Sequence, residues 1–216
     1  MEPEKQRQRK LWGRSLSRPL SPTQKDLFDK SMDTFSYTHH HIDFFQKYNA
    51  FVLEIGFGDG EHLLGMALEN PTMGFIGCER FINGVANLFK GIEEHQLKNI
   101  RVFNDDVHFL IEDLPKNKLE RIFVLFPDPW PKKKHHKRRL LTKEFMGLCH
   151  TLLAPGGKLC MASDIEDYRN FIQEEAAQVQ DLFVLRETIS APMTKYCRKA
   201  EKAGRHSLMS IYEKKE

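Results

Sequence analysis

Segments with the character of buried strands alternate with helical segments from residue 51 onward, and this alternation restricts the possible folds more than any other feature. The strand-like apolar runs cover 51–56, 74–79, 100–105, 121–129, 158–164, 182–188 and 206–214. Helical spacing of apolar residues follows the first five runs, at 60–70, 82–97, 106–114, 142–153 and 165–179. Short links between such segments are typical of a mainly parallel sheet with helices on both faces. The sequence therefore predicts an α/β fold that binds ligands beyond the carboxyl ends of its strands.

The length and composition fit a soluble chain that is retained in the cytoplasm. The chain has 216 residues, of which 40% are hydrophobic and 29% are charged. No apolar run approaches the roughly 18 residues of a membrane helix, and charge at the second position excludes a secretory signal. The cysteines have neither metal-ligand spacing nor a disulfide pattern, so we expect reduced thiols at Cys78, Cys149, Cys160 and Cys197.

Positive charge is concentrated in two places, although the net charge is only +3. Residues 1–25 carry seven Lys and Arg against two Glu, and residues 132–139 carry six with no acid. We expect residues 1–34 to form a basic, mobile arm and residues 35–216 to form one domain, which begins with a short helix within 35–48. The two patches indicate contact with a polyanion, and the alternative is a solvated tail and a solvated loop.

A glycine-rich turn follows the first predicted strand, in the segment VLEIGFGDGEHLL. Glu54 ends the strand, and Gly56, Gly58 and Gly60 permit a tight turn that a ligand can approach closely. A dinucleotide-binding turn would place its third glycine at Glu61, where a carboxylate would repel a pyrophosphate. The turn therefore favours a ligand without phosphates, and the alternative is a plain strand-to-helix turn.

Acidic side chains also follow the second and third predicted strands. Glu79 ends the second strand, where it can accept hydrogen bonds from ribose hydroxyls. Asp105 or Asp106 follows the third strand and can meet an adenine amino group, although Asp106 can equally be a helix N-cap. Together with the glycine-rich turn, these acids predict a nucleoside site, which S-adenosyl-L-methionine fits.

The segment FPDPWPKKKHHKRR, residues 126–139, joins a rigidly held acid to the densest positive charge in the chain. Pro127 and Pro129 fix the backbone on both sides of Asp128, just beyond the fourth predicted strand. We therefore expect Asp128 at the same sheet edge as the nucleoside site. Trp130 is expected to provide a stacking face or a packing anchor. The plainer alternatives are a turn aspartate and a core tryptophan.

Five segments resemble the TrmB family of tRNA (guanine-N7-)-methyltransferases: EIGFGDG, CER, FPDPWPKKKHHKRR, ASD and TKYCRKAEKAG. The resemblance runs from about residue 50 to the C-terminus. It implies a Rossmann-like class I methyltransferase fold, with a seven-stranded sheet and an antiparallel last strand. It also implies methyl transfer from S-adenosyl-L-methionine to N7 of a guanine in the tRNA variable loop, at tRNA position 46.

The resemblance further implies roles for individual residues, with Asp128 as the catalytic acid. The residues expected at the cofactor are Glu54, Gly56, Gly58, Glu79, Asp105, Asp106 and Asp128. The residues expected at the substrate are Lys132, Asp164, Thr194, Lys195, Tyr196 and Cys197, with a helix cap as the alternative for Asp164. The basic residues expected at the RNA backbone are Lys133, Lys134, Lys137, Arg138 and Arg139.

One position departs from the family pattern, in which a glutamate follows the threonine by three residues. Cys197 stands at that position, so the carboxylate is missing or comes from a neighbour such as Glu201. The alternatives for the function are a class I methyltransferase for another RNA, a protein or a small molecule, a catalytically weakened RNA-binding scaffold and, least favoured, an NAD enzyme. We expect no metal site at the histidines 39–41, no membrane contact, and either a monomer or a homodimer.

Overall fold

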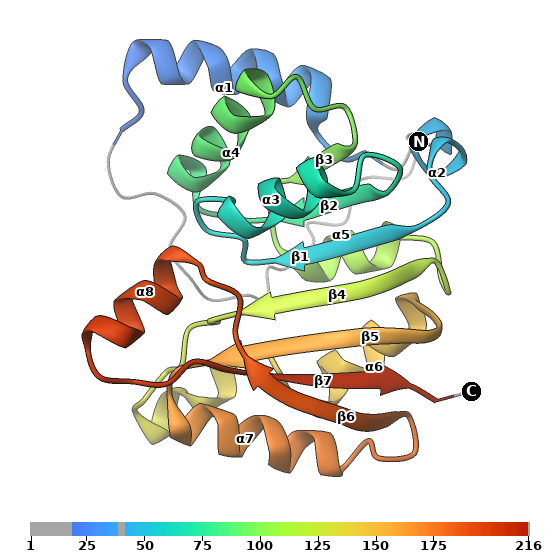
Figure 1. Ribbon diagram of the computed structural model, residues 1–216, viewed down its shortest axis with the longest axis vertical. Coiled ribbons are helices and arrows are strands. Elements are labelled where there is room, and N and C mark those ends of the chain that lie inside the picture. The colour runs from blue at the N-terminus through green and yellow to red at the C-terminus, as the bar shows by residue number, and fades with distance from the viewer. Residues whose placement is uncertain (1–18, 39–41, 216) are drawn as a thin grey trace, which may run out of the picture.

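The computed structural model describes residues 19–38 and 42–215, and its centre is a seven-stranded sheet (Figure 1). The strands are β1 (Phe51–Ile55), β2 (Gly74–Cys78), β3 (Ile100–Phe103), β4 (Leu119–Leu125), β5 (Leu153–Ser163), β6 (Phe183–Ser190) and β7 (Leu208–Lys214). Their order is β3-β2-β1-β4-β5-β7-β6. Strands β1 to β5 are all parallel to one another, and β7 is antiparallel to both β5 and β6. The predicted sheet, including its antiparallel last strand, is confirmed.

Helices cover both faces of this sheet. They are α1 (Pro22–Phe35), α2 (Ile42–Lys47), α3 (Glu61–Glu69), α4 (Ile82–Glu94), α5 (Val107–Asp113), α6 (Lys143–Leu152), α7 (Glu166–Ala177) and α8 (Lys195–Lys202), with a 3-10 helix η1 (Lys133–Arg138). Helices α3 and α4 lie on one face, and α5, α6 and α7 lie on the other (Figure 1). Helix α8 lies at the edge of the sheet where the parallel strands end. Among the described residues, no helix is both long and apolar enough to cross a membrane.

Polar side chains fix the starts of several helices. Ser21 and Gln24 form a reciprocal capping box at the start of α1, and Pro22 occupies its first turn. The side chain of Asp106 accepts the backbone N–H of His108 at the start of α5. These bonds use N–H groups that the first turn of a helix leaves without partners.

The core consists of two layers because side chains alternate across each strand. On β1, Phe51, Leu53 and Ile55 join the layer under α5, α6 and α7, whereas Val52 joins the layer under α3 and α4. All five residues of β1 are buried, which explains why the strand is one continuous apolar run apart from Glu54. Strand β5 begins before the predicted run 158–164, and the segment APGG, residues 154–157, forms an irregularity within it between Leu153 and Lys158.

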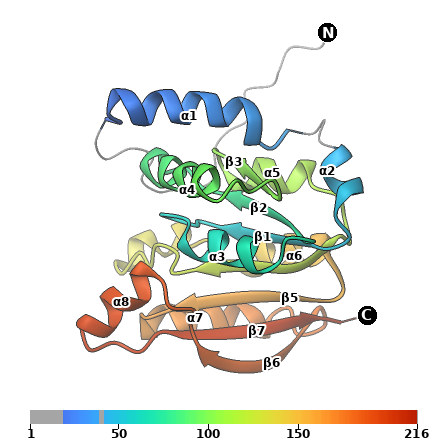
Figure 2. The ribbon, with the colours of Figure 1, turned by 45° about the horizontal axis from the view of Figure 1, so that its top comes forward.

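Part of the segment that the sequence predicts to be a mobile arm, residues 1–34, instead forms helix α1. It lies across α4 (Figure 2), where Phe28 and Phe35 contact the fully buried ring of Phe89, with ring centroids 5.7 and 6.3 Å away. The apolar spacing of Phe28, Met32 and Phe35 gives α1 a face that packs on the domain. The domain therefore includes this helix, and residues 1–18 of the expected arm lie outside the described residues.

Replacing Phe28 by Ala tests whether α1 belongs to the domain. Phe28 is half-buried against Phe89, so its loss should lower the free energy of unfolding by about 1–2 kcal/mol. Chemical denaturation measures this value. Lys30→Ala on the exposed side of the same helix is the control and should change it by less than about 0.5 kcal/mol. Equal stabilities of the two variants would contradict the packing of α1.

Candidate functional site

A cleft of about 760 Å³ lies at the carboxyl edge of the sheet. The ends of β1, β2 and β4, the loops that follow β1 to β4, and helix α8 form its walls. The residues that line it include Gly56, Gly58, Glu79, Arg80, Phe81, Asp105, Phe126, Pro127, Asp128, Trp130, Arg138, Leu140, Tyr196 and Lys199. The cleft thus brings together the glycine-rich turn, the acids after β2 and β3, and Asp128.

The glycine-rich turn requires glycine at two positions. Gly58 has φ +57°, and a Cβ there would lie 3.1 Å from the ring of Tyr196. Gly60 has φ +81° and begins α3, where a Cβ would lie 2.9 Å from the side chain of Leu88. Both positions combine a left-handed backbone with close packing, which only glycine accommodates without strain.

The carboxylate of Glu79 holds this turn from the neighbouring strand. Its oxygens accept backbone N–H groups from Gly58 at 2.8 Å, from Arg80 at 2.7 Å and from Phe81 at 2.9 Å. Burial raises the pKa of Glu79 above its ordinary value, while these three N–H groups oppose the shift and the charge of Asp128 adds to it. Glu79 therefore lies in the cleft and fixes the shape of its floor.

The two aspartates after β3 have different positions. Asp105 lines the cleft, and its carboxylate also accepts the backbone N–H of Asp106 at 2.8 Å. Asp106 is fully buried, caps α5 and lies 2.8 Å from Nδ1 of His108. The helix-cap alternative therefore describes Asp106, and Asp105 is the acid of this pair that faces the cleft.

The backbone around Asp128 is strained on both sides. Phe126 has φ +53° and Trp130 has φ +45°, values that non-glycine residues rarely adopt. Each such residue costs on the order of 1–3 kcal/mol and persists only where surrounding contacts hold it. The strained loop leaves Asp128 exposed at the rim of the cleft, with Pro127 and Pro129 half-buried beside it.

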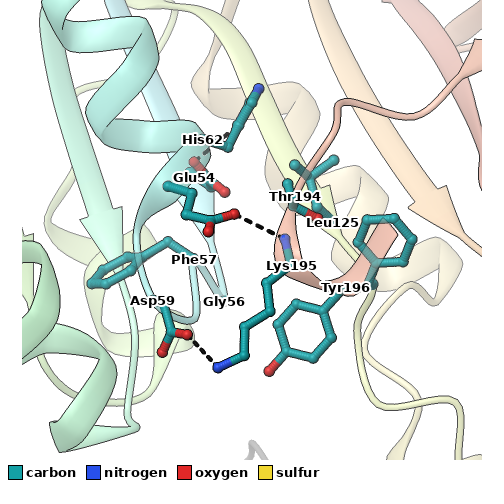
Figure 3. A pocket seen from close by; sticks show the side chains of 11 residues that line it. Glu54, Gly56, Phe57, Asp59, His62, Leu125, Thr194, Lys195 and Tyr196 are labelled. Carbon is teal, nitrogen blue, oxygen red and sulfur yellow. Dashed lines mark hydrogen bonds and ion pairs between the residues drawn. The ribbon is translucent and has the colours of Figure 1, made fainter. Parts of the chain in front are cut away.

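Glu54 lies behind the glycine-rich turn, in a separate pocket of about 20 Å³ (Figure 3). The side chain is buried, and its Oε2 lies 3.1 Å from Nδ1 of His62. The ring of His62 packs edge-on against Phe123. Glu54 does not line the cleft itself. Gly56 lines both the small pocket and the cleft, so it lies between Glu54 and the cleft.

The basic segment divides into outward and inward side chains. The lysines are exposed, at Lys132, Lys133, Lys134 and Lys137. Arg138 is half-buried, lines the cleft and lies 4.9 Å from the centroid of the Trp130 ring. Arg139 is only 4% exposed and is bonded within the protein, which departs from its expected place at an RNA backbone.

His135 adds little charge to this segment. Partial burial and the neighbouring positive charges of Arg138, Lys132 and Lys137 lower the pKa of His135 below its ordinary value. His135 is therefore mostly neutral at pH 7, and its ring packs edge-on against Trp130. The positive potential of the surface comes from lysine and arginine.

Helix α8 is fastened to the glycine-rich turn by ionic contacts, some of which Figure 3 shows. The Nζ of Lys195 donates to Asp59. The carboxylate of Glu61 accepts the backbone N–H of Lys195 at 2.9 Å and the guanidinium of Arg198 at 2.6 and 2.8 Å. These contacts hold α8 over one end of the cleft.

The first turn of α8 contains the position that departs from the family pattern. The hydroxyl of Thr194 caps the helix by accepting the N–H of Cys197 at 3.2 Å, and both side chains are buried. Glu201 lies in the last turn of the helix, away from Thr194. The carboxylate that does reach the first turn comes from Glu61 on α3.

Tyr196 is the residue of this segment that faces the cleft. Its ring stacks on that of Phe126, with centroids 6.2 Å apart and planes 23° apart. Burial, followed by the charges of Glu79 and Asp59, raises the pKa of its hydroxyl, so the group stays protonated at neutral pH. Tyr196 therefore presents a neutral aromatic face half exposed to solvent.

Asp164 lies outside this group of residues. It follows β5 and pairs with the guanidinium of Arg205 at 2.7 Å, while the N–H of Ile165 is accepted by Ser163 instead. Arg80 and Lys199 also line the cleft, although neither was predicted from the sequence. The position of Arg80 next to Glu79 in the motif CER could have predicted its place in the cleft. No sequence pattern predicts the place of Lys199, because it depends on how α8 packs on the domain.

Metal chemistry finds no support in the part of the chain that the structure describes. No group of three or more His, Cys, Asp and Glu side chains there is arranged to hold a metal ion. The histidines 39–41 lie outside the described residues.

Replacing Glu61 by Ala tests the attachment of α8. The substitution removes an acceptor for the N–H of Lys195 and the ion pair with Arg198, so α8 should open more readily. We expect amide hydrogen exchange in α8 to become about fivefold to tenfold faster. Glu69→Ala at the far end of α3 is the matched control. Unchanged exchange in α8 would show that Glu61 does not hold it.

Comparison with known proteins identifies the family of this chain. A family model described as "Putative methyltransferase" matches residues 48–209. A tRNA (guanine-N(7)-)-methyltransferase of Hyphomonas neptunium is 45% identical over 73% of this chain and 74% of its own length. The protein of that name from Rhizobium johnstonii is 41% identical over 75% of this chain and 73% of its own length.

Solved structures support the fold independently. The 16S rRNA methyltransferase KamB superposes with a TM-score of 0.61 at 14% identity, over 83% of this chain and 94% of its own. At this identity the likeness concerns the fold alone, which is that of a class I methyltransferase. With the family model and the close relatives, it shows that the chain belongs to the TrmB family of tRNA (guanine-N7-)-methyltransferases.

Proposed function

We propose that this protein transfers a methyl group from S-adenosyl-L-methionine to N7 of a guanine in the variable loop of tRNA. The observation that carries the proposal is one cleft that joins Glu79 and Asp105, suited to a nucleoside, to Asp128 and the basic segment. Relatives with up to 48% identity bear the name of this activity. A tRNA substrate also agrees with the cytoplasmic location that the sequence predicts.

The residues of the cleft fit S-adenosyl-L-methionine. Glu79 and Asp105 stand at adjacent strand ends, where carboxylates can accept hydrogen bonds from ribose hydroxyls and from the adenine amino group. Gly56, where an added Cβ would have no atom within 4 Å, leaves room for close approach, and Asp59 and Glu61 further along the turn disfavour a phosphate. The volume of about 760 Å³ is sufficient for a nucleoside and a second purine.

The methyl donor supplies an electrophilic methyl group on a sulfonium, so the chain itself has two tasks. N7 of guanine has a free lone pair in the plane of the base, and the attack needs no general base. The first task is therefore to place the base in line with the methyl group. The second is to stabilise the positive charge that grows on the purine. The exposed carboxylate of Asp128 is suited to both, because it can accept N–H groups of the base and offset its charge.

The exposed lysines are suited to holding the RNA around the target base. Lys132, Lys133, Lys134 and Lys137 are exposed, follow Asp128 closely in the chain and have no acid among them. Bases in an RNA helix are hidden in a deep, narrow groove, whereas loops expose them, which favours a loop guanine as the target. Tyr196 and Phe126 present aromatic faces beside Asp128 on which a base can stack.

A methyl-transfer assay tests the reaction, the substrate and the acid together. With labelled S-adenosyl-L-methionine and unmodified tRNA, nucleoside digestion should place the label in 7-methylguanosine. Asp128→Asn removes the charge at nearly constant shape, so kcat should fall by about 10²- to 10³-fold. The Kd of the cofactor, measured by calorimetry, should change by less than about threefold.

Glu120→Gln is the control for this assay, because Glu120 is an exposed acid on β4 away from the cleft. It should retain the turnover of the unaltered protein. Label in another nucleoside would overturn the choice of N7, and full turnover in Asp128→Asn would remove Asp128 from the mechanism.

The salt dependence of tRNA binding tests the basic segment. If the exposed lysines contact phosphates, the logarithm of Kd should rise steeply with the logarithm of salt concentration. Lys133→Met should lower that slope by about 1. Lys118→Met is the matched control, because this exposed lysine immediately precedes β4 at the opposite edge of the sheet. A slope near zero in the unaltered protein would count against electrostatic binding by this segment.

A further inference from the structure

Arg139 is the most deeply buried residue of the basic segment 132–139. Its side chain is 4% exposed. The Nε donates to the carbonyl oxygen of Pro129 at 3.0 Å, and a terminal nitrogen pairs with Asp167 on α7. The guanidinium lies 5.2 Å from the ring centroid of Tyr168 and 4.9 Å from that of Phe171. One side chain thus links the loop that carries Asp128 to a helix of the domain.

The strained loop needs a restraint at each end. On the strand side, the N–H of Phe126 donates to the carbonyl of Ala162 on β5 at 2.9 Å. On the far side, the bond from Arg139 reaches the carbonyl of Pro129, the residue directly after Asp128. Since both Phe126 and Trp130 hold unfavourable φ values, releasing either end would let the loop relax and move Asp128.

The chemistry of the contact calls for arginine and not for any cation. A guanidinium presents several donors in a fixed plane and stacks on aromatic rings, so it can bind a carbonyl, a carboxylate and two rings at once. An ammonium group is a single hydrated charge on a flexible stem and cannot reproduce that arrangement. A phosphate contact has a weaker requirement, because lysine also binds phosphate well.

We propose that Arg139 is a positioning residue for Asp128 and not an RNA contact. It fixes the carbonyl of Pro129 against α7 and so sets where the Asp128 carboxylate stands in the cleft. The effect on turnover rests on the proposed function, whereas the effect on the loop does not. The neighbouring basic residues have other roles. The exposed lysines supply the positive charge of the surface, and Arg138 packs on Trp130.

Two substitutions at Arg139 distinguish positioning of Asp128 from contact with RNA. Arg139→Lys keeps the charge and Arg139→Met removes it. We expect both variants to lower kcat at saturating tRNA by about 100-fold, the loss that a misplacement of about 1 Å can produce. The Kd for tRNA should change by less than about twofold, and its salt slope should stay the same. Lys133→Met is the matched control and should show the opposite pattern, with a weaker Kd and a slope lower by about 1.

A direct measurement of the loop accompanies the kinetics. The chain has two tryptophans, so Trp12→Phe leaves Trp130, two residues after Asp128, as the only tryptophan, which can be excited selectively over tyrosine. In this background, quenching by acrylamide should increase in Arg139→Lys and Arg139→Met but not in Lys133→Met. Thermal unfolding of each variant shows that the fold persists. If Arg139→Met does not fold, Arg139→Lys decides the question alone.

The results that would overturn the proposal are specific. Full turnover in Arg139→Lys would mean that a positive charge is sufficient. A weaker Kd and a lower salt slope in Arg139→Met would make Arg139 a phosphate contact. If the unaltered protein does not methylate tRNA, the proposed function fails, but the quenching of Trp130 still decides whether Arg139 holds the loop.

Discussion

The carboxylate of Glu79 is the interaction on which the geometry of the cleft depends. It accepts N–H groups from the turn after β1 and from its own turn after β2, so two loops that are distant in sequence share one anchor. Such an arrangement arises because parallel strands end at the same edge of the sheet. The cost of burying this charge is reflected in its raised pKa, and the three N–H groups offset part of that cost.

Helix α8 shows how the chain accommodates a cysteine where the family has glutamate. A threonine followed by glutamate at the third position forms a capping box, in which the glutamate binds backbone N–H at the helix start. Here Thr194 retains its half of that arrangement, and Cys197 is buried. Glu61 reaches the first turn of α8 from α3 and also pairs with Arg198. The start of α8 therefore keeps a carboxylate, but one that belongs to the glycine-rich turn.

The sequence predicted the sheet and the grouping of Glu79, Asp105 and Asp128 because both follow from local patterns. Apolar runs define buried strands, and residues directly after parallel strands meet at one edge. Other features depend on packing between distant segments and leave no local signal. The inward turn of Arg139 depends on Asp167 and Phe171 on α7. The packing of α1 depends on Phe89, and its many polar residues resemble those of an arm.

The separation of charge within the site follows from the same constraints. Glu79, Asp105 and Asp128 line the cleft together with Arg80, Arg138 and Lys199, whereas Lys132, Lys133, Lys134 and Lys137 are exposed and do not line it. An acid among the exposed lysines would weaken their attraction for RNA. The proline residues around Asp128 and the buried Arg139 restrain the loop that joins this acid to the exposed lysines. The position of the acid relative to the positive surface is therefore set by the rigidity of this segment.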